Sequence, residues 1–121
     1  GADVILQAAG GTGIGVLQAA ADAGVLGIGT DSNQNGLHPG HVLTSLLKRT
    51  DVAVVEAFAD WAPGVRVLGL AEDGMDWVLD EHNRALVTPE MAQAAEAAAA
   101  DIASGAIAVH DSSTEGPCPA L

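Results

Sequence analysis

The sequence predicts an α/β fold built on a parallel β-sheet, and three consecutive segments near its start carry that prediction. Residues 3–9 are a short, largely apolar run that ends at glycines, as a buried parallel strand does. Residues 12–23 carry apolar side chains at helical spacing, and residues 25–29 form a second apolar run. A strand, a glycine turn, a helix and a strand within about thirty residues form a βαβ unit, whose right-handed crossover implies a parallel sheet.

Particular residues support each element of this unit. The expected helix over 12–23 places four apolar side chains on one face: Ile14, Leu17, Ala20 and Ala21. Gly24 suits the end of this helix, because glycine adopts the left-handed conformation of many C-caps. The strand over 25–29 leads into Thr30-Asp31, so an acidic side chain stands at its carboxyl end.

The middle of the chain predicts a loop, a third strand and a second helix. Residues 32–40, with Asn, Gly and Pro, are expected to form the loop, and His41–Lys48 has the β-branched and alternating residues of a strand. Thr50-Asp51 can cap a helix over 51–61, which Pro63-Gly64 stops. This helix gathers apolar residues on one face, among them Val52, Val55 and Ala59.

The last part of the chain predicts one further strand and a long helix. Val65–Leu70 is expected to be a strand, whereas residues 71–87 have poor periodicity and allow only a short strand at Trp77–Leu79. Thr88 is a good N-cap, and Pro89-Glu90 suits the first turn of a helix that runs to about Ser104 and ends at Gly105. From Asp111 onward the chain is turn-rich and is expected to be ordered only where it packs against something.

Composition and charge exclude several classes of function. The formal charge of −12 is spread along the chain, which favours solubility and disfavours binding to phosphate backbones, so nucleic acid is not an expected partner. The aromatic residues are few, namely Phe58, Trp61 and Trp77, so the core should be aliphatic.

Neither a metal nor a cofactor is expected from the residues present. Cys118 is the single cysteine and forms no internal disulfide or metal cluster. The four histidines lack the spacing of metal ligands: His38, His41, His82 and His110. No apolar run reaches the roughly 18 residues of a membrane span, and the first residues lack the regions of a signal peptide.

The glycine cluster Gly10-Gly11-Thr12-Gly13-Ile14-Gly15 lies between a strand and a helix, where backbone N–H groups can receive a polar ligand. It is not a dinucleotide fingerprint, because Val16 stands where G-x-G-x-x-G needs a small residue. The chain has no Gly-Lys-Ser/Thr sequence to end a P-loop, and it has no tyrosine to serve as the catalytic residue of a short-chain dehydrogenase. The glycines therefore serve a tight turn, a ligand contact, or both.

Two charged residues at strand ends are candidates for ligand binding. Asp31 lies at the carboxyl end of a strand, where open α/β sheets bind their ligands, although a loop-capping role also fits it. Lys48 ends the third strand and is one of only four basic residues, although it also fits an ordinary surface lysine.

Several motifs, in order, resemble the basic membrane protein (BMP) family of ABC-transporter substrate-binding lipoproteins. They cover nearly the whole chain: residues 1–16 (GADVILQAAGGTGIGV), 20–24 (AADAG), 28–34 (IGTDSNQ), 43–49 (LTSLLKR), 51–54 (DVAV), 68–70 (LGL) and 86–90 (LVTPE). The resemblance implies a partial type I periplasmic-binding-protein fold, whose two Rossmann-like lobes close on a ligand, which in characterised members is a purine or other nucleoside.

The resemblance also implies a division of the chain and a set of binding residues. Residues 1–43 would belong to the second lobe, 44–48 to a hinge crossing, 49–110 to the first lobe and 111–121 to a flexible tail. In the family motif G-V-D-x-D-Q the aspartate that resembles a ribose-hydroxyl ligand falls on Asp31. The glycine pair near the ligand falls on Gly10 and Gly11, and the hinge lysine on Lys48. Thr30 and Asn33 depart from the family motif, which leaves the sugar preference open.

The function that follows is binding without chemistry. A nucleoside would be captured and passed to an ABC permease by an extracytoplasmic protein, lipid-anchored or periplasmic. The N-terminal half, with its lipid-bearing cysteine and the aromatic residues that stack on a base, would lie outside this chain, and the isolated chain is expected to self-associate. The alternatives are a nucleotide-binding α/β enzyme, for which no nucleophile and base are visible, and a ligand-sensing regulatory domain.

Overall fold

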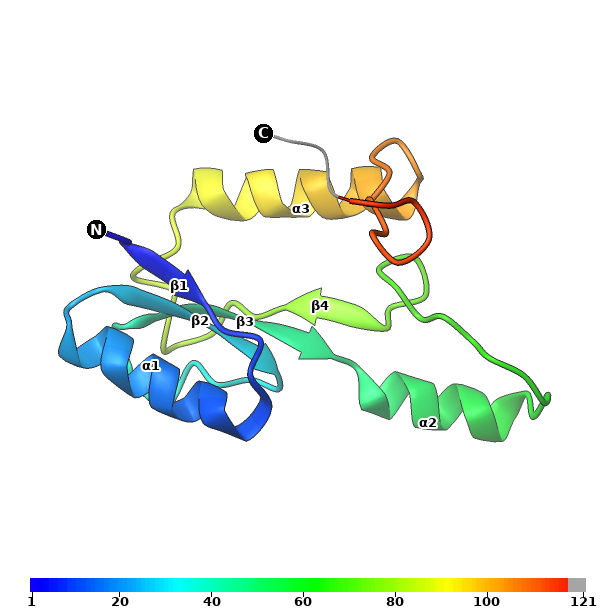
Figure 1. The fold of residues 1–121 in the computed structure, drawn as a ribbon, viewed down its shortest axis with the longest axis horizontal. Coiled ribbons are helices and arrows are strands. Elements are labelled where there is room, and N and C mark those ends of the chain that lie inside the picture. Colours follow the sequence, from blue (N-terminus) through cyan, green and yellow to red (C-terminus); the bar gives the residue numbers. More distant parts are fainter. Residues whose placement is uncertain (118–121) are drawn as a thin grey trace.

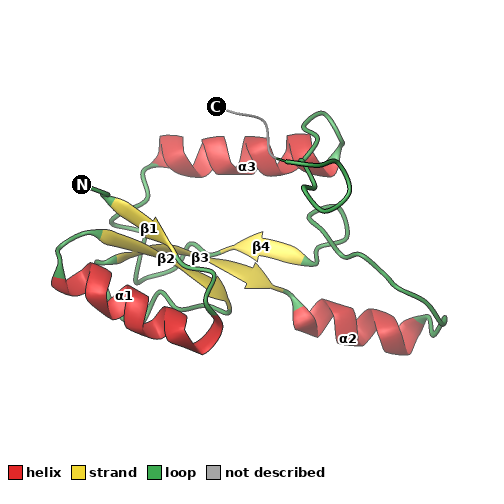
Figure 2. Cartoon of the chain, in the orientation of Figure 1, coloured by secondary structure: helices red, strands yellow, loops and turns green. Residues whose placement is uncertain are grey.

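The structure, a computed structural model, describes residues 1–117 of the 121-residue chain (Figures 1 and 2). Its elements follow in the order β1 (Val4–Leu6), a 3-10 turn (Gly10–Thr12), α1 (Gly13–Asp22), β2 (Leu26–Asp31), β3 (Val42–Lys48), α2 (Thr50–Ala59), β4 (Met75–Trp77) and α3 (Pro89–Ala103). The interpretations of Cys118 and of the last four residues of the tail concern residues 118–121, which lie outside the described part.

The four strands form one sheet in the order β1-β2-β3-β4. β1 pairs with β2, and β2 with β3, both in parallel, so the predicted α/β fold with a parallel sheet is confirmed over these three strands. β4 is antiparallel to β3 and pairs Met75 with Lys48 and Trp77 with Leu46. The sheet is thus mostly parallel, with one antiparallel edge strand.

The core lies between α1 and the sheet, and it is small and aliphatic. Leu17 and Ala20 of α1 and Val42 of β3 are each about 1% exposed. Gly27 of β2 allows the helix to approach, because a Cβ atom there would lie 2.5 Å from Leu17 Cδ2. The predicted face of α1 is correct for Leu17 and Ala20, whereas Ile14 is half exposed.

Helices α2 and α3 form where the sequence predicts them but contribute no fully buried side chain. α1 and α3 lie on opposite sides of the sheet, and α2 continues beyond the end of β3 (Figure 1). Thr88 caps α3 as predicted, since its Oγ1 accepts the Met91 N–H at 3.2 Å. In α2, by contrast, the N-cap is Arg49, and Thr50 is already helical.

The strand predicted at Val65–Leu70 is absent, which corrects that prediction. These residues have no regular structure, and Val65 and Val67 are 95% and 84% exposed. An extended segment becomes a strand only when a neighbour accepts and donates its hydrogen bonds, and in the described chain the free edge of β3 pairs with β4 instead. β4 overlaps the short strand predicted at Trp77–Leu79 but begins two residues earlier.

Residues 111–117 make a turn around one carboxylate. Asp111 accepts hydrogen bonds from the backbone and hydroxyl of Ser113 and from the Thr114 hydroxyl. His110 approaches Glu115 at 2.9 Å, and its other ring nitrogen lies 2.9 Å from the Gly116 carbonyl.

Candidate ligand-binding site

The carboxyl ends of β2 and β3 bring two of the predicted site residues together. Asp31 ends β2 and Lys48 ends β3, and because the strands run parallel, both side chains emerge at the same edge of the sheet. Lys48 Nζ lies 2.9 Å from Asp31 Oδ1, and both side chains are more than half exposed. An exposed pair of this kind contributes about 1 kcal/mol or less to stability, so a ligand can replace it at small cost.

This ion pair lines a cavity of about 300 Å³. Seven residues from the strand ends and the glycine turn surround it: Ala8, Gly10, Thr30, Asp31, Leu46, Lys48 and Met75. Three of the four predicted site residues therefore meet here, while Gly11 is exposed next to the cavity's Gly10 and is not among the lining residues. The cavity lies at the carboxyl edge of a parallel sheet, which is where open α/β proteins bind ligands.

The glycine cluster divides into two roles. Gly10 has φ of +53°, a conformation that glycine adopts without strain, and a Cβ atom on Gly10 or Gly11 would meet nothing within 4 Å. Gly13, the first residue of α1, is buried against the side-chain amide of Gln7, and a Cβ atom there would overlap that amide. Gly13 thus serves close packing, while Gly10 leaves room at the cavity.

The backbone at Asp31 is strained. Its φ is +69°, and the N–H of Ser32 donates to the Thr30 carbonyl at 2.9 Å, which closes a three-residue γ-turn around Asp31. Aspartate tolerates positive φ better than most residues, yet such a conformation still costs on the order of 1–3 kcal/mol. Strain of this kind persists only when the surroundings hold it, and it is found most often at functional sites.

A network of polar side chains lies next to this turn. The Gln7 amide donates to Thr30 Oγ1 at 3.0 Å and to Gln34 Oε1 at 3.1 Å, and its own oxygen accepts the Ala9 N–H. Gln34 Oε1 also accepts the Thr30 N–H at 3.1 Å. Neither Gln7 nor Gln34 is among the residues predicted from the sequence to bind a ligand, although a polar side chain within the apolar run 3–9 is a signal that points to Gln7.

The network continues below the loop that follows β2. Ser45 of β3 is fully buried, accepts the Gln34 N–H at 2.9 Å and donates to Asn35 Oδ1 at 2.7 Å. A Cβ atom on Gly29 would lie 2.8 Å from both Gln34 and Ser45, so glycine is required for this packing. No buried side-chain nitrogen or oxygen among residues 1–117 lacks a hydrogen-bond partner.

Asp80 joins the same loop to a segment far along the chain. Its Oδ2 accepts from the Asn33 amide at 2.9 Å and from the Asn35 amide at 3.2 Å, and its Oδ1 accepts the His82 N–H at 2.8 Å. These bonds lower the pKa of Asp80, with the Asn33 bond as the largest cause, against the opposing effect of burial. Asn33 stands where the family motif has an aspartate. Its amide can donate to Asp80, whereas an aspartate at position 33 would repel the Asp80 carboxylate.

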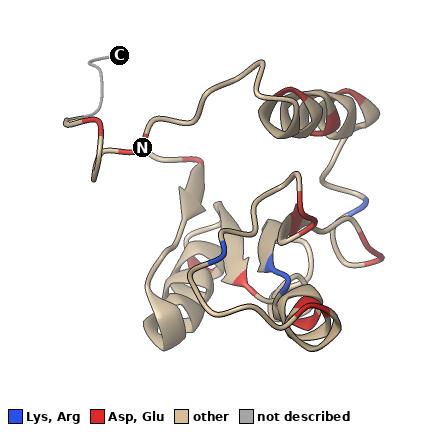
Figure 3. Cartoon of the chain, turned by 90° about the vertical axis from the view of Figure 1, so that its right-hand side faces the viewer, with Lys and Arg blue, Asp and Glu red and all other residues tan. Residues whose placement is uncertain are grey.

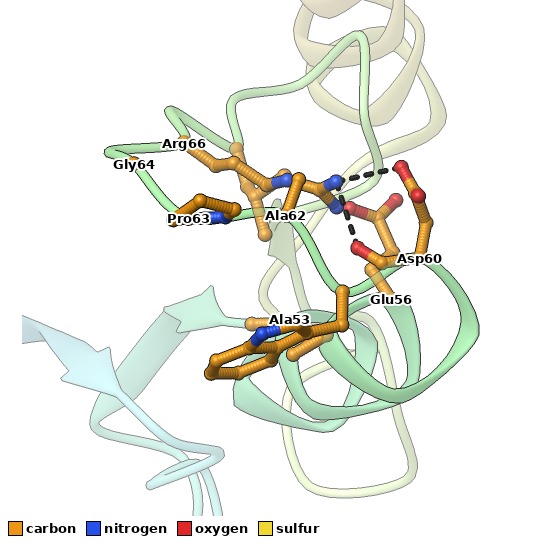
Figure 4. A pocket seen from close by; sticks show the side chains of 10 residues that line it. Ala53, Glu56, Asp60, Ala62, Pro63, Gly64 and Arg66 are labelled. Carbon is orange, nitrogen blue, oxygen red and sulfur yellow. Dashed lines mark hydrogen bonds and ion pairs between the residues drawn. The ribbon is translucent and has the colours of Figure 1, made fainter.

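Another cavity, of about 330 Å³, lies between α2 and the segment that follows it. Alanines and Trp61 form much of its wall, and Arg66 reaches across to Asp60 at 2.7 Å (Figure 4). None of the predicted site residues lines it.

Acidic residues are spread over helices and loops and do not gather at one place (Figure 3). Among residues 1–117 no three His, Cys, Asp or Glu side chains are grouped closely enough to hold a metal ion. The helices of this part of the chain are all too short or too polar to cross a membrane.

Comparison with known proteins identifies a family and one relative. Residues 1–81 match the family model Bmp, described as an ABC transporter substrate-binding protein, PnrA-like. Basic membrane protein D of Borreliella burgdorferi (strain JD1) is 37% identical in an alignment of 91 residues that covers 68% of this chain and 27% of that protein. The chain thus spans little more than a quarter of the length of this relative.

The matched residues contain all the features of the cavity at the sheet edge. The glycine turn, the β1–α1–β2 unit and the strand ends at Asp31 and Lys48 all lie between residues 1 and 81. Members of this family are substrate-binding proteins, so the prediction of a binding protein and not an enzyme is confirmed at the level of the family. The chain belongs to the Bmp family of PnrA-like ABC transporter substrate-binding proteins.

Proposed function

We propose that this chain is part of an extracytoplasmic solute-binding protein that captures a nucleoside, with purine nucleosides favoured, and delivers it to an ABC permease. The observation that carries the proposal is the Asp31–Lys48 pair in a cavity at the carboxyl edge of the sheet. Family membership supports the transport role. We also propose that the whole protein is held at the outer face of the membrane by a lipid anchor or is free in the periplasm.

The chemistry of the pair suits a ribose. An ionised carboxylate accepts hydrogen bonds through both oxygens, so Asp31 can receive the protons of two vicinal hydroxyl groups. Lys48 supplies three donors for a ribose or base acceptor, and its ion pair with Asp31 is exposed enough to rearrange when the ligand enters. Gly10 keeps the cavity wall free of a side chain, which lets the backbone approach the ligand. We place Gly11 beside it as a second backbone contact.

The remainder of the whole protein is proposed to complete the site. None of the residues that line the cavity is aromatic, although stacking is the usual way to hold a base. We assign residues 1–43 to the second lobe, 44–48 to a hinge crossing, 49–110 to the first lobe and 111–121 to a tail. Residues 44–48 form the carboxyl part of β3, next to the cavity.

Apolar side chains are exposed on α2 and on the segment after it, which supports the proposal that another part of the whole protein packs there. Phe58 is 89% exposed and Trp61 is 83% exposed, and Val65 and Val67 are similarly bare. A soluble protein rarely leaves such a group of side chains in water, so we propose that the rest of the whole protein covers them. In the isolated chain the same surface favours self-association.

Calorimetric titration of the whole protein with inosine, adenosine, guanosine and cytidine tests the proposal. Asp31→Asn keeps the size of the side chain and its tolerance of positive φ but removes the charge, and it should weaken nucleoside binding about 10- to 100-fold. Asp22→Asn, an exposed aspartate on α1, is the matched control and should bind as the unaltered protein does. Unchanged affinity in Asp31→Asn, or no binding of any nucleoside, would contradict the proposal.

A further inference from the structure

The γ-turn that presents Asp31 lies past the end of β1, so that only β3 still pairs with Thr30 and Asp31. Leu26 of β2 donates its N–H to the Asp3 carbonyl, so even-numbered residues of β2 direct their N–H groups toward β1. The last pair between these strands joins Leu6 to Ile28. The Thr30 N–H therefore lies past the end of β1, and the Gln34 side-chain oxygen takes the place of a strand carbonyl at 3.1 Å.

The direction of each bond in this network is fixed by backbone groups at both ends. The Thr30 N–H can only donate, so the atom of Gln34 that it meets must be the oxygen. Gln7 must then present its NH₂ group to that oxygen, and its own oxygen faces the Ala9 N–H, which also can only donate. Each amide thus has a single orientation in which all of its donors and acceptors are paired, so the position of the oxygen and of the NH₂ group is fixed for both Gln7 and Gln34.

The packing around the two amides leaves them little room to move. Gln7 is 3% exposed, and α1 begins directly against it at Gly13, where a side chain would overlap the amide. Gln34 is held from the other side by its backbone N–H, which donates to the buried Ser45 hydroxyl at 2.9 Å. Thr30 therefore forms two hydrogen bonds with these amides: its N–H donates to Gln34, and its hydroxyl accepts from Gln7.

We propose that Gln7 and Gln34 are positioning residues of the ligand site, whose amides hold Thr30 and thereby maintain the strained turn that presents the Asp31 carboxylate to the cavity. The Thr30 carbonyl accepts the bond that closes this turn, and on the side away from β3 only the two amides hold Thr30, so their loss should let the turn relax and Asp31 leave its positive φ. Asp31 then no longer faces Lys48 with the geometry that a diol requires. The inference rests on the proposed function for its ligand but on the described contacts for its geometry.

Two substitutions at one position separate the hydrogen bonds from the shape of the side chain. Gln34→Met keeps the length of the side chain and removes the acceptor, whereas Gln34→Glu keeps an oxygen acceptor for both the Gln7 amide and the Thr30 N–H. Gln18→Met makes the same exchange at an exposed glutamine of α1 and serves as the control. Gln7→Met removes the network from its other end and keeps the test available if Gln34→Met does not fold.

Three quantities are measured for each variant of the whole protein: hydrogen exchange at the Thr30 N–H by NMR, φ of Asp31 in a crystal structure, and calorimetric affinity for nucleosides. In Gln34→Met we expect faster exchange, loss of the positive φ and affinity about tenfold weaker or worse, the fold-change of one lost buried hydrogen bond. Gln34→Glu should keep slow exchange, the positive φ and most of the affinity, and Gln18→Met should match the unaltered protein.

The outcomes distinguish this inference from the proposed function. If a folded Gln34→Met or Gln7→Met variant keeps Asp31 at positive φ and the Thr30 N–H protected, the inference is overturned whatever the ligand is. It is also overturned if the turn relaxes while nucleoside affinity stays unchanged. If the unaltered protein binds no nucleoside, the proposed function fails, and the exchange and φ measurements alone decide the inference.

Discussion

Near the carboxyl end of β2, polar side chains hold the loop and turn that carry Asp31: Gln7 and Gln34 bond Thr30, and Asn33 bonds Asp80. Asp31 and Lys48 could be chosen from the sequence, because they end strands at the edge where open α/β sheets bind ligands. The sequence marks Gln7 only as a polar residue in an apolar run and does not mark Gln34, since the roles of both arise from contacts between residues 23 and 27 positions apart. Asn33 is similar: its partner Asp80 is 47 positions away.

The hydrogen bonds to Asp80 make the stability of this region depend on pH. The pKa of Asp80 is lowered in the folded chain, so the carboxylate contributes stability that is fully present above the unfolded pKa of about 3.9 and is lost as the pH falls through the lower folded-state value. Asp80→Asn replaces one of the two acceptor oxygens with an NH₂ group, which then faces either the Asn33 and Asn35 amides or the His82 N–H, and it should lower stability at neutral pH.

Urea unfolding at pH 7 and at several values below pH 5 checks this prediction. The unaltered protein should lose more stability between those conditions than Asp80→Asn, because the variant no longer has this carboxylate to protonate. Asp101→Asn, at an exposed position of α3, is the control and should follow the unaltered protein. Parallel acid curves for the protein and Asp80→Asn would show that Asp80 is not the group responsible.

Local sequence signals predicted the helices and the βαβ unit. Which of the remaining segments form strands depends instead on whether they pair with a neighbouring strand. The helix ends at Gly24 and Gly105 and the cap at Thr88 depend on neighbouring residues only, so the sequence indicates them directly. The apolar run Val65–Leu70 looks like a strand by itself, but a strand needs a partner. Among the described residues, the edge of β3 pairs with Met75–Trp77 instead.

The glycines at the start of α1 provide a test of packing against intrinsic helix preference. Gly13→Ala puts a methyl group where the Gln7 amide lies and should destabilise the fold by about 1–3 kcal/mol, because the buried network has to break. Gly15→Ala lies in the same helix with nothing within 4 Å and should stabilise it by about 0.5–1 kcal/mol. Denaturant unfolding of both variants measures the difference, and a shift of the same sign in both would refute the assigned role of Gly13.

At the scale of the whole molecule, one half of the described chain is better packed than the other. The β1–α1–β2–β3 region has the buried core, whereas α2, α3 and the segment between α2 and β4 keep most apolar side chains in water. The alignment with the relative from Borreliella burgdorferi covers 27% of that protein. We therefore expect other parts of the whole protein to pack against these exposed surfaces. The sequence could not show this exposure, because an apolar helix face looks the same whether or not it has a partner.

If the Asp31 carboxylate binds the vicinal diol of a nucleoside, as we propose, the protein should distinguish adenosine from 2′-deoxyadenosine, which lacks one of the two hydroxyl groups. Calorimetry on the whole protein should find 2′-deoxyadenosine about tenfold or more weaker than adenosine, since one hydroxyl donor to a charged acceptor is lost. In Asp31→Asn the two nucleosides should bind with nearly equal, weak affinity. Equal affinity in the unaltered protein, or a preference for adenosine that survives in Asp31→Asn, would contradict the claim.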